Sequence, residues 1–229
     1  RGKVDLNNVF IDSIFFSSIK GSYKYEDNII TSDNIKIISE EFTGEVKVDS
    51  LMNNEKYNLS GYMNFDNIAS NHFLKQYNLD SLSGNLEFRY QKHINKSSIS
   101  AQINLNDGIL FNKTFTQFEG QINGEVINDK YTGNSKGLLI GWNYDPFIWD
   151  NIDYQINYSD FDTSFYSIRA LSSAGDRLEI SGSKSLQGNY NISNFIGLLK
   201  QNELYVHPFF INKKNDYVHI PKAIIKFGD

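Results

Sequence analysis

The 229-residue sequence contains no cysteine, only three prolines and no long apolar run. The lack of cysteine excludes disulfides and thiolate metal sites and leaves the redox compartment open. No window approaches the ~20 apolar residues of a membrane-spanning helix, so we expect any membrane anchor or signal peptide to lie outside this chain. The net charge of −5, with both signs interspersed, forms no basic stripe, and we expect no nucleic-acid partner.

The sequence is instead rich in aromatic residues (14%) and in alternating apolar and polar positions. The stretch 81–126 shows this most densely, because Leu86, Phe88 and Tyr90 follow the glycine of Leu82-Ser83-Gly84 with one polar residue between each. A period of two is typical of a half-buried strand. Asn106-Asp107-Gly108 predicts a tight turn, since these residues tolerate positive φ.

The same alternation recurs along the chain, which predicts a mostly antiparallel all-β fold. A further turn is predicted at Glu26-Asp27-Asn28. The segments expected to form strands are 4–11, 19–25, 29–38, 42–48, 57–65, 82–90, 99–105, 118–126, 131–133, 138–142, 152–158, 165–171, 178–182, 186–190 and 223–227.

One or two short helices are expected to interrupt the strands. Between Ile68 and Tyr77 the apolar spacing becomes helical, and Asp66 or Asn67 can cap the first turn. A second strand-and-helix unit is expected where Leu186-Gln187-Gly188 leads through Ile192 to Leu199-Lys200-Gln201, which repeats the earlier Leu-Lys-Gln ending. Two such units in series favour an elongated architecture, with 1–128 and 129–229 as possible subunits. Because residue 1 is Arg, we interpret residues 1–229 as a fragment of a longer, repetitive β-sheet protein.

Little in the sequence points to catalysis, a metal or a cofactor, and we predict none of them. The histidines lack ligand spacing, no Gly-x-Ser-x-Gly elbow occurs, and no phosphate-binding glycine loop is present. Acidic residues cluster at 145–162, and carboxylates are the residue type that binds calcium or forms a glycosidase pair. Their spacing matches no calcium-binding loop, so we interpret them as residues of solvated turns. The residues concerned are His72, His93, His207 and His219, and Asp145, Asp150, Asp153, Asp160 and Asp162.

The densest aromatic group could form a platform on which a sugar stacks, or pack as ordinary core. It predicts, as an alternative function, an extracellular glycan- or protein-binding β module of the adhesin kind. A polysaccharide-active enzyme using Asp145 and Asp153 is a further alternative. The platform candidates are Trp142, Tyr144, Trp149 and Tyr154, with Phe147 and Tyr158 nearby.

The run LSGYMNFDNIASNHFLKQYNLDSLSGNLEFRY, followed by ISAQINLNDGILFNKTFTQFEGQINGEV, resembles the AsmA-like superfamily of bacterial envelope proteins, of the AsmA, TamB and YhdP type. The resemblance covers most of the chain. It is strongest from Leu59 to Val126 and weak from Asp160 onward.

The resemblance implies a non-enzymatic periplasmic segment, anchored in the inner membrane by a helix that this chain does not contain. Members form a long, curled, taco-like sheet whose apolar groove carries phospholipid between the inner and outer membranes or supports outer-membrane assembly. The implied partners are phospholipid or another acyl-chain lipid and outer-membrane assembly proteins.

Alternation places a set of apolar side chains on the face that would line such a groove. The same alternation fits the inside of a closed sandwich, so the residues themselves leave groove and core open. The groove candidates are Leu59, Met63, Phe65, Leu86, Phe88, Ile99, Ile103, Leu105, Ile122 and Val126.

Overall fold

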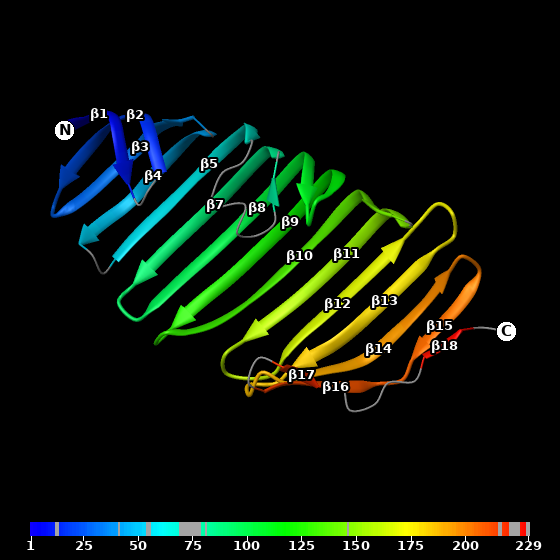
Figure 1. Ribbon diagram of the computed structural model, residues 1–229. Helices are drawn as coiled ribbons and strands as arrows, with labels where there is room; N and C mark the ends of the chain where they lie inside the picture. The colour runs from blue at the N-terminus through cyan, green and yellow to red at the C-terminus, as the bar shows by residue number, and fades with distance from the viewer. Residues whose placement is uncertain are drawn as a thin grey trace. The chain divides into compact units, whose positions relative to one another are not determined.

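The computed structural model divides into two compact units, Arg1–Asn128 and Asp129–Asp229, here called unit 1 and unit 2. In each unit the strands run side by side largely in chain order (Figure 1). The residues that the structure describes are 1–11, 14–40, 42–53, 56–68, 79–80, 82–145, 147–214, 217–219 and 225–227.

Unit 1 is an antiparallel sheet in which each long strand pairs with its neighbours in sequence. The short β6 continues the line of β7 and pairs with the end of β8. Its strands are β1 (Gly2–Ile11), β2 (Ile14–Glu26), β3 (Ile29–Ser39), β4 (Phe42–Asn53), β5 (Lys56–Ile68), β6 (Leu79–Asp80), β7 (Leu82–His93), β8 (Lys96–Leu110) and β9 (Lys113–Ile127).

Unit 2 is also antiparallel: β10 to β14 pair in order, and β14 then pairs with β15 at one end and β16 at the other. β15 pairs with β18 and β16 with β17. Its strands are β10 (Lys130–Tyr144), β11 (Phe147–Ser159), β12 (Ser164–Leu171), β13 (Arg177–Lys184), β14 (Tyr190–Leu199), β15 (Asn202–Val206), β16 (Phe209–Lys214), β17 (Tyr217–His219) and β18 (Ile225–Phe227). The prediction of a mostly antiparallel all-β fold is confirmed.

Several of the hairpin turns, such as those at 27–28, 111–112 and 200–201, are formed by two consecutive residues with positive φ. Asp27 and Asn28 have φ of 50° and 62°, which confirms the turn predicted there. The turn predicted at Asn106-Asp107-Gly108 is wrong, because those residues lie within β8 and the chain reverses at 111–112 instead. Asp107 does adopt a positive φ of 50°, but a two-residue turn of this type requires two such residues in succession.

The prediction of a second helix is also wrong. Residues 190–199 form β14, and Leu186 to Gly188 lie in the turn before it rather than in a strand. Opposite β13, Ser193 is an extra residue in the ladder, because Ser181 pairs with Asn194 while Gly182 pairs with Ile192. Such a bulge shifts the alternation by one position and produces the apolar spacing that resembled a helix. Ile68 ends β5, and the rest of the first predicted helix lies outside the described residues.

Burial is shallow in both units. In the described part of the chain no large side chain is fully buried, and most strand positions are half-buried. The hydrophobic side chains that are buried are Ile19, Leu82, Leu105 and Phe115 in unit 1, and Leu139, Trp149, Ala170, Ile192 and Val206 in unit 2.

Candidate functional site

The groove candidates lie together on one face of the unit 1 sheet. Residues directly opposite each other on paired strands share a face, as do residues two apart on one strand. Met63, Leu86 and Ile103 form one such row across β5, β7 and β8. The register places the remaining candidates on the same face, namely Leu59, Phe65, Phe88, Ile99, Leu105, Ile122 and Val126.

This apolar face extends beyond the predicted residues. The row that contains Phe88 continues through Gly61 to Val46 and Ile35 on β4 and β3. The sequence analysis found these strands but did not connect them, since the alternation of one strand does not reveal which residue of the next strand lies beside it. The face therefore spans the whole of unit 1, and we call it the unit 1 apolar face.

The unit 1 apolar face is buried at one end and more exposed toward the other. Leu82 is 3% exposed and Leu105 is 8% exposed, and the ladder places both on this face near the β6–β8 pairing. Ile99 and Ile122, nearer the other end, are 43% and 37% exposed. One end therefore has a small core, whereas Ile99 and Ile122 remain accessible to solvent and most other side chains of the face are half-buried.

Glycines allow aromatic rings to lie flat on this sheet. A methyl group added to Gly108 would lie 2.3 Å from the ring of Phe115, and one added to Gly61 would lie 3.1 Å from the ring of Phe88. The missing side chains thus provide the space that the rings occupy. Phe88 lies on the apolar face, whereas the register places Phe115 on the opposite face, in line with Glu119.

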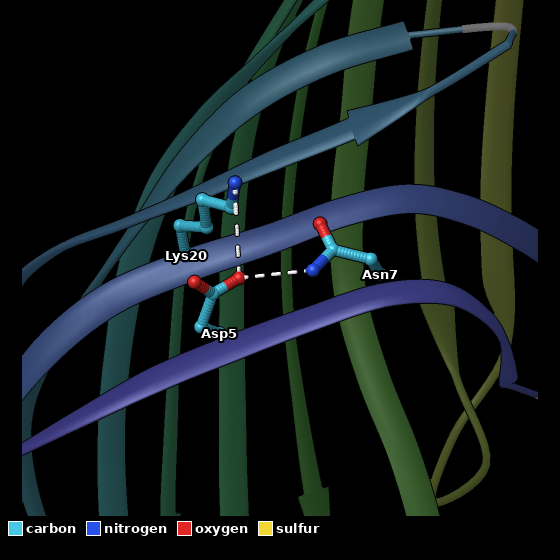
Figure 2. Close-up of polar contacts among 3 residues, drawn as sticks. All are labelled: Asp5, Asn7 and Lys20. Atoms are coloured by element: carbon cyan, nitrogen blue, oxygen red, sulfur yellow. Dashed lines mark hydrogen bonds and ion pairs between the residues drawn. The ribbon is translucent and has the colours of Figure 1, made fainter.

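The opposite face of unit 1 is polar and carries its own rows of charges. Lys20 Nζ lies 3.7 Å from Asp5 Oδ1, which also accepts a hydrogen bond of 3.1 Å from Asn7 Nδ2 (Figure 2). Further along the same row, Lys36 and Glu45 form a second ion pair of 3.7 Å. Exposed pairs of this kind contribute about 0–1 kcal/mol each, so they keep this face hydrated more than they stabilise the fold.

A cavity of about 500 Å³ opens on this polar face, over β5, β7, β8 and β9. Its polar side chains come from two adjacent rows of the register, one crossing Tyr62 and Glu87 and the other crossing Arg89. The sequence analysis predicted no site at these residues. The lining consists of Ser60, Tyr62, Glu87, Arg89, Ser100, Gln102, Gln121 and Asn123, with Gly61, Phe88 and Ala101 beneath them.

Tyr62 is held in place at the rim of this cavity. Desolvation and the neighbouring Glu45 carboxylate, to which its hydroxyl is hydrogen-bonded, raise the pKa of Tyr62. The phenol therefore remains neutral at physiological pH and can donate that hydrogen bond, while its side chain remains 40% exposed.

In unit 2 the aromatic platform candidates separate into a cluster and an isolated residue. Trp142 lies opposite Trp149, and its ring is 5.3 Å from that of Tyr144. Phe147 stacks on Trp149 at 5.9 Å. Tyr154 lies five residues beyond Trp149, about 16 Å along the strand, where its hydroxyl shares a hydrogen bond with Ser135.

Trp149 is 6% exposed, which leaves its ring faces no room for a sugar. Lys200 lies at the edge of the cluster, with Nζ 5.6 Å from the centre of the Phe147 ring. The buried tryptophan is typical of a hydrophobic anchor between strands. Trp149 therefore packs one end of unit 2, whereas Tyr144 is 48% exposed.

Most of the acidic residues that were considered as ligands or catalysts instead bind backbone N–H groups. Asp150 accepts from Ser173, and Asp162 accepts from Thr163. Asp160 accepts from the Tyr131 N–H and from the Tyr158 hydroxyl. These two donors, the Tyr158 hydroxyl first, lower the pKa of Asp160, and the same hydrogen bond raises the pKa of Tyr158.

Asp145 and Asp153, the two carboxylates considered as a catalytic pair, are not brought together. Asp145 precedes β11, and Asp153 lies six residues beyond the first residue of that strand, about 20 Å away. A glycosidase pair requires carboxylates within roughly 5–10 Å. The described part of the chain, which includes His93 and His207, has no group of three potential ligands that could hold a metal.

Where the chain is described, it has no helix of the length and apolarity needed to cross a membrane. No protein-family model matches the chain, and neither does any curated protein or solved structure.

Proposed function

We propose that this chain is a non-enzymatic segment of a bacterial envelope protein and that its unit 1 apolar face binds the acyl chains of phospholipid. In this proposal the sheet curls along its length into a groove in the periplasm. The groove carries lipid between the inner and outer membranes or supports outer-membrane assembly, and a segment outside this chain anchors it to the inner membrane.

The observation that supports this proposal is an apolar sheet face whose side chains are mostly half-buried and in part exposed to solvent. Ile99 and Ile122 each expose more than a third of their surface, although they share this face with Phe88 and Ile103. Large exposed apolar patches on soluble proteins commonly mark sites for apolar partners. An acyl chain matches such a face because it carries no polar groups that must be desolvated.

The gain from covering this face can be estimated residue by residue. Complete burial of an isoleucine side chain contributes about 1.5–3 kcal/mol, so covering the exposed 43% of Ile99 contributes about 1 kcal/mol. Several such side chains along the face would hold an acyl chain by small increments. Weak binding spread over many contacts suits a conduit, because the lipid can move along the face without breaking one strong contact.

The proposal is tested by photo-crosslinking in cells. A photoreactive residue replaces Phe88 or Ile103 on the apolar face, and matched controls replace Lys36 or Glu119 on the polar face, since the register places these controls on the opposite side of the same sheet. We expect covalent lipid adducts at Phe88 and Ile103 and none at the controls.

Two outcomes would contradict the proposal. Adducts of equal yield at all four positions would mean that lipid contacts the protein non-specifically. No adduct at Phe88 or Ile103 in a folded protein would mean that another layer of protein covers the apolar face. The second outcome would favour a β module that binds a protein partner.

A further inference from the structure

The polar cavity of unit 1 has a composition that sets it apart from the rest of its face. Elsewhere on the polar face, charged side chains form ion pairs across the strands, as Asp5 does with Lys20 and Lys36 with Glu45. Arg89 and Glu87 line the cavity, yet neither belongs to an ion pair in the part of the chain that the structure describes.

The neighbours of Arg89 explain why its guanidinium stays accessible. Ser60 on β5 and Ser100 on β8 lie directly opposite Arg89 on either side. Serine is too short to cover a guanidinium or to neutralise it. The register therefore places a group with five N–H donors between two small hydroxyl side chains on the floor of the cavity.

The row beside it supplies complementary groups. Glu87 lies opposite Tyr62 on β5 and opposite Gln102 on β8, and Gln102 in turn lies opposite Gln121 on β9. Carboxylate oxygens only accept hydrogen bonds, whereas amides both donate and accept. The side chain of Tyr62 adds a partly exposed aromatic ring, and its hydroxyl is already bonded to Glu45.

The charge of this lining indicates a neutral ligand. One arginine and one glutamate cancel, and the other polar side chains, which are hydroxyls and amides, are uncharged. A phosphate or carboxylate ligand would meet the Glu87 carboxylate two residues from Arg89, which opposes its binding. A ligand whose groups both donate and accept hydrogen bonds fits the mixture better.

We propose that this cavity binds a short neutral oligosaccharide. Arg89, Glu87, Gln102 and Gln121 form hydrogen bonds with pairs of sugar hydroxyls, and one sugar ring lies on the ring of Tyr62. Adjacent sugar hydroxyls offer the paired geometry that a planar guanidinium or carboxylate can engage with two hydrogen bonds at once. The volume of about 500 Å³ falls within the range of known ligand pockets, ~300–1,000 Å³. This site lies on the face opposite the proposed lipid surface and does not depend on it.

The test begins with the 229-residue chain on an array of neutral oligosaccharides built from glucose, galactose, mannose and N-acetylglucosamine. The strongest binder is then titrated by calorimetry against the unaltered chain and four variants. Arg89→Ala and Gln102→Ala remove groups of the cavity. Arg89→Lys keeps the charge but loses the planar fork. Lys20→Ala is a matched control on the same face outside the cavity.

We expect Arg89→Ala, Arg89→Lys and Gln102→Ala each to weaken oligosaccharide binding at least tenfold, and Lys20→Ala to leave it unchanged. Circular dichroism checks that each variant folds, which we expect because Arg89, Gln102 and Lys20 are exposed. Inorganic phosphate, glycerol phosphate and an unstructured peptide are titrated in parallel.

Three results would overturn the inference. The first is an array with no binder, and the second is binding that Arg89→Ala leaves unchanged. The third is tighter binding of phosphate, glycerol phosphate or the peptide than of every oligosaccharide. In particular, binding of phosphate that Arg89→Lys preserves would identify an anion site. Because lipid adducts at Phe88 are measured separately, failure here leaves the proposal for the apolar face intact.

Discussion

A charge placed on the unit 1 apolar face distinguishes an open face from a covered core. Ile122 is 37% exposed, so the carboxylate of Ile122→Glu can reach water from that position. The variant then loses chiefly the burial of the isoleucine. With about 63% of a contribution of ~1.5–3 kcal/mol lost, the free energy of unfolding should fall by about 1–2 kcal/mol.

Leu105→Glu is the matched comparison, because Leu105 lies on the same face but is 8% exposed. A carboxylate there would be buried without a partner, which costs several kcal/mol or prevents ionisation. We therefore expect Leu105→Glu to destabilise unit 1 at least twice as much as Ile122→Glu, or to prevent it from folding.

Urea unfolding followed by far-ultraviolet circular dichroism measures the difference. Tryptophan fluorescence does not report on unit 1, since both Trp142 and Trp149 lie in unit 2. With a urea dependence of ~1–3 kcal/mol per molar, Ile122→Glu should lower the midpoint by about 0.3–2 M. Equal and severe losses for the two variants would refute the open face, because a covered face would bury both charges.

Three further predictions follow from the described geometry. Gly84→Ala should lower the free energy of unfolding of unit 1, measured in urea, by at least about 3 kcal/mol. Gly84 has a φ of +147°, and an added methyl group would lie 2.0 Å from a backbone carbonyl oxygen. A loss below about 1 kcal/mol would contradict this geometry. Trp149→Ala should lower the free energy of unfolding of unit 2, measured by thermal unfolding, by about 3–5 kcal/mol. Tyr144→Ala, at a 48% exposed position, should lower it by less than half as much. Equal losses would show that Trp149 is not an anchor. Because its folded-state pKa is lowered, Asp160 stabilises the fold above its unfolded pKa, and this contribution disappears as the pH falls through the folded pKa. NMR titration of the Asp160 carboxyl carbon should show that Tyr158→Phe moves this pKa back toward its usual value, and an unchanged pKa would show that the hydrogen bond does not control it.

Local alternation was sufficient to predict which side chains share a face within a strand. Leu86 and Phe88 lie two apart in β7, and so do Ile103 and Leu105 in β8, and each pair lies on the unit 1 apolar face. Side-chain direction in a strand depends only on the parity of the residue. This is why the strands and their apolar sides were predicted from the sequence.

Parity is lost at irregular residues, and there the prediction was wrong. Ser193 shifts the alternation of β14 and mimics helical spacing. Asp107 adopts positive φ inside β8 instead of reversing the chain. In both cases the outcome depends on pairing with a neighbouring strand, which local sequence does not specify.

The sequence by itself therefore determined an antiparallel all-β chain with one apolar and one polar side to each regular strand. Only the tertiary structure decided that Leu82 and Phe115 are buried while Ile99 stays accessible, and that Arg89 lies between two serines beside a cavity. The physical reason is that burial and cavities depend on cross-strand register and on what lies over each face, and both arise from contacts between residues far apart in the sequence.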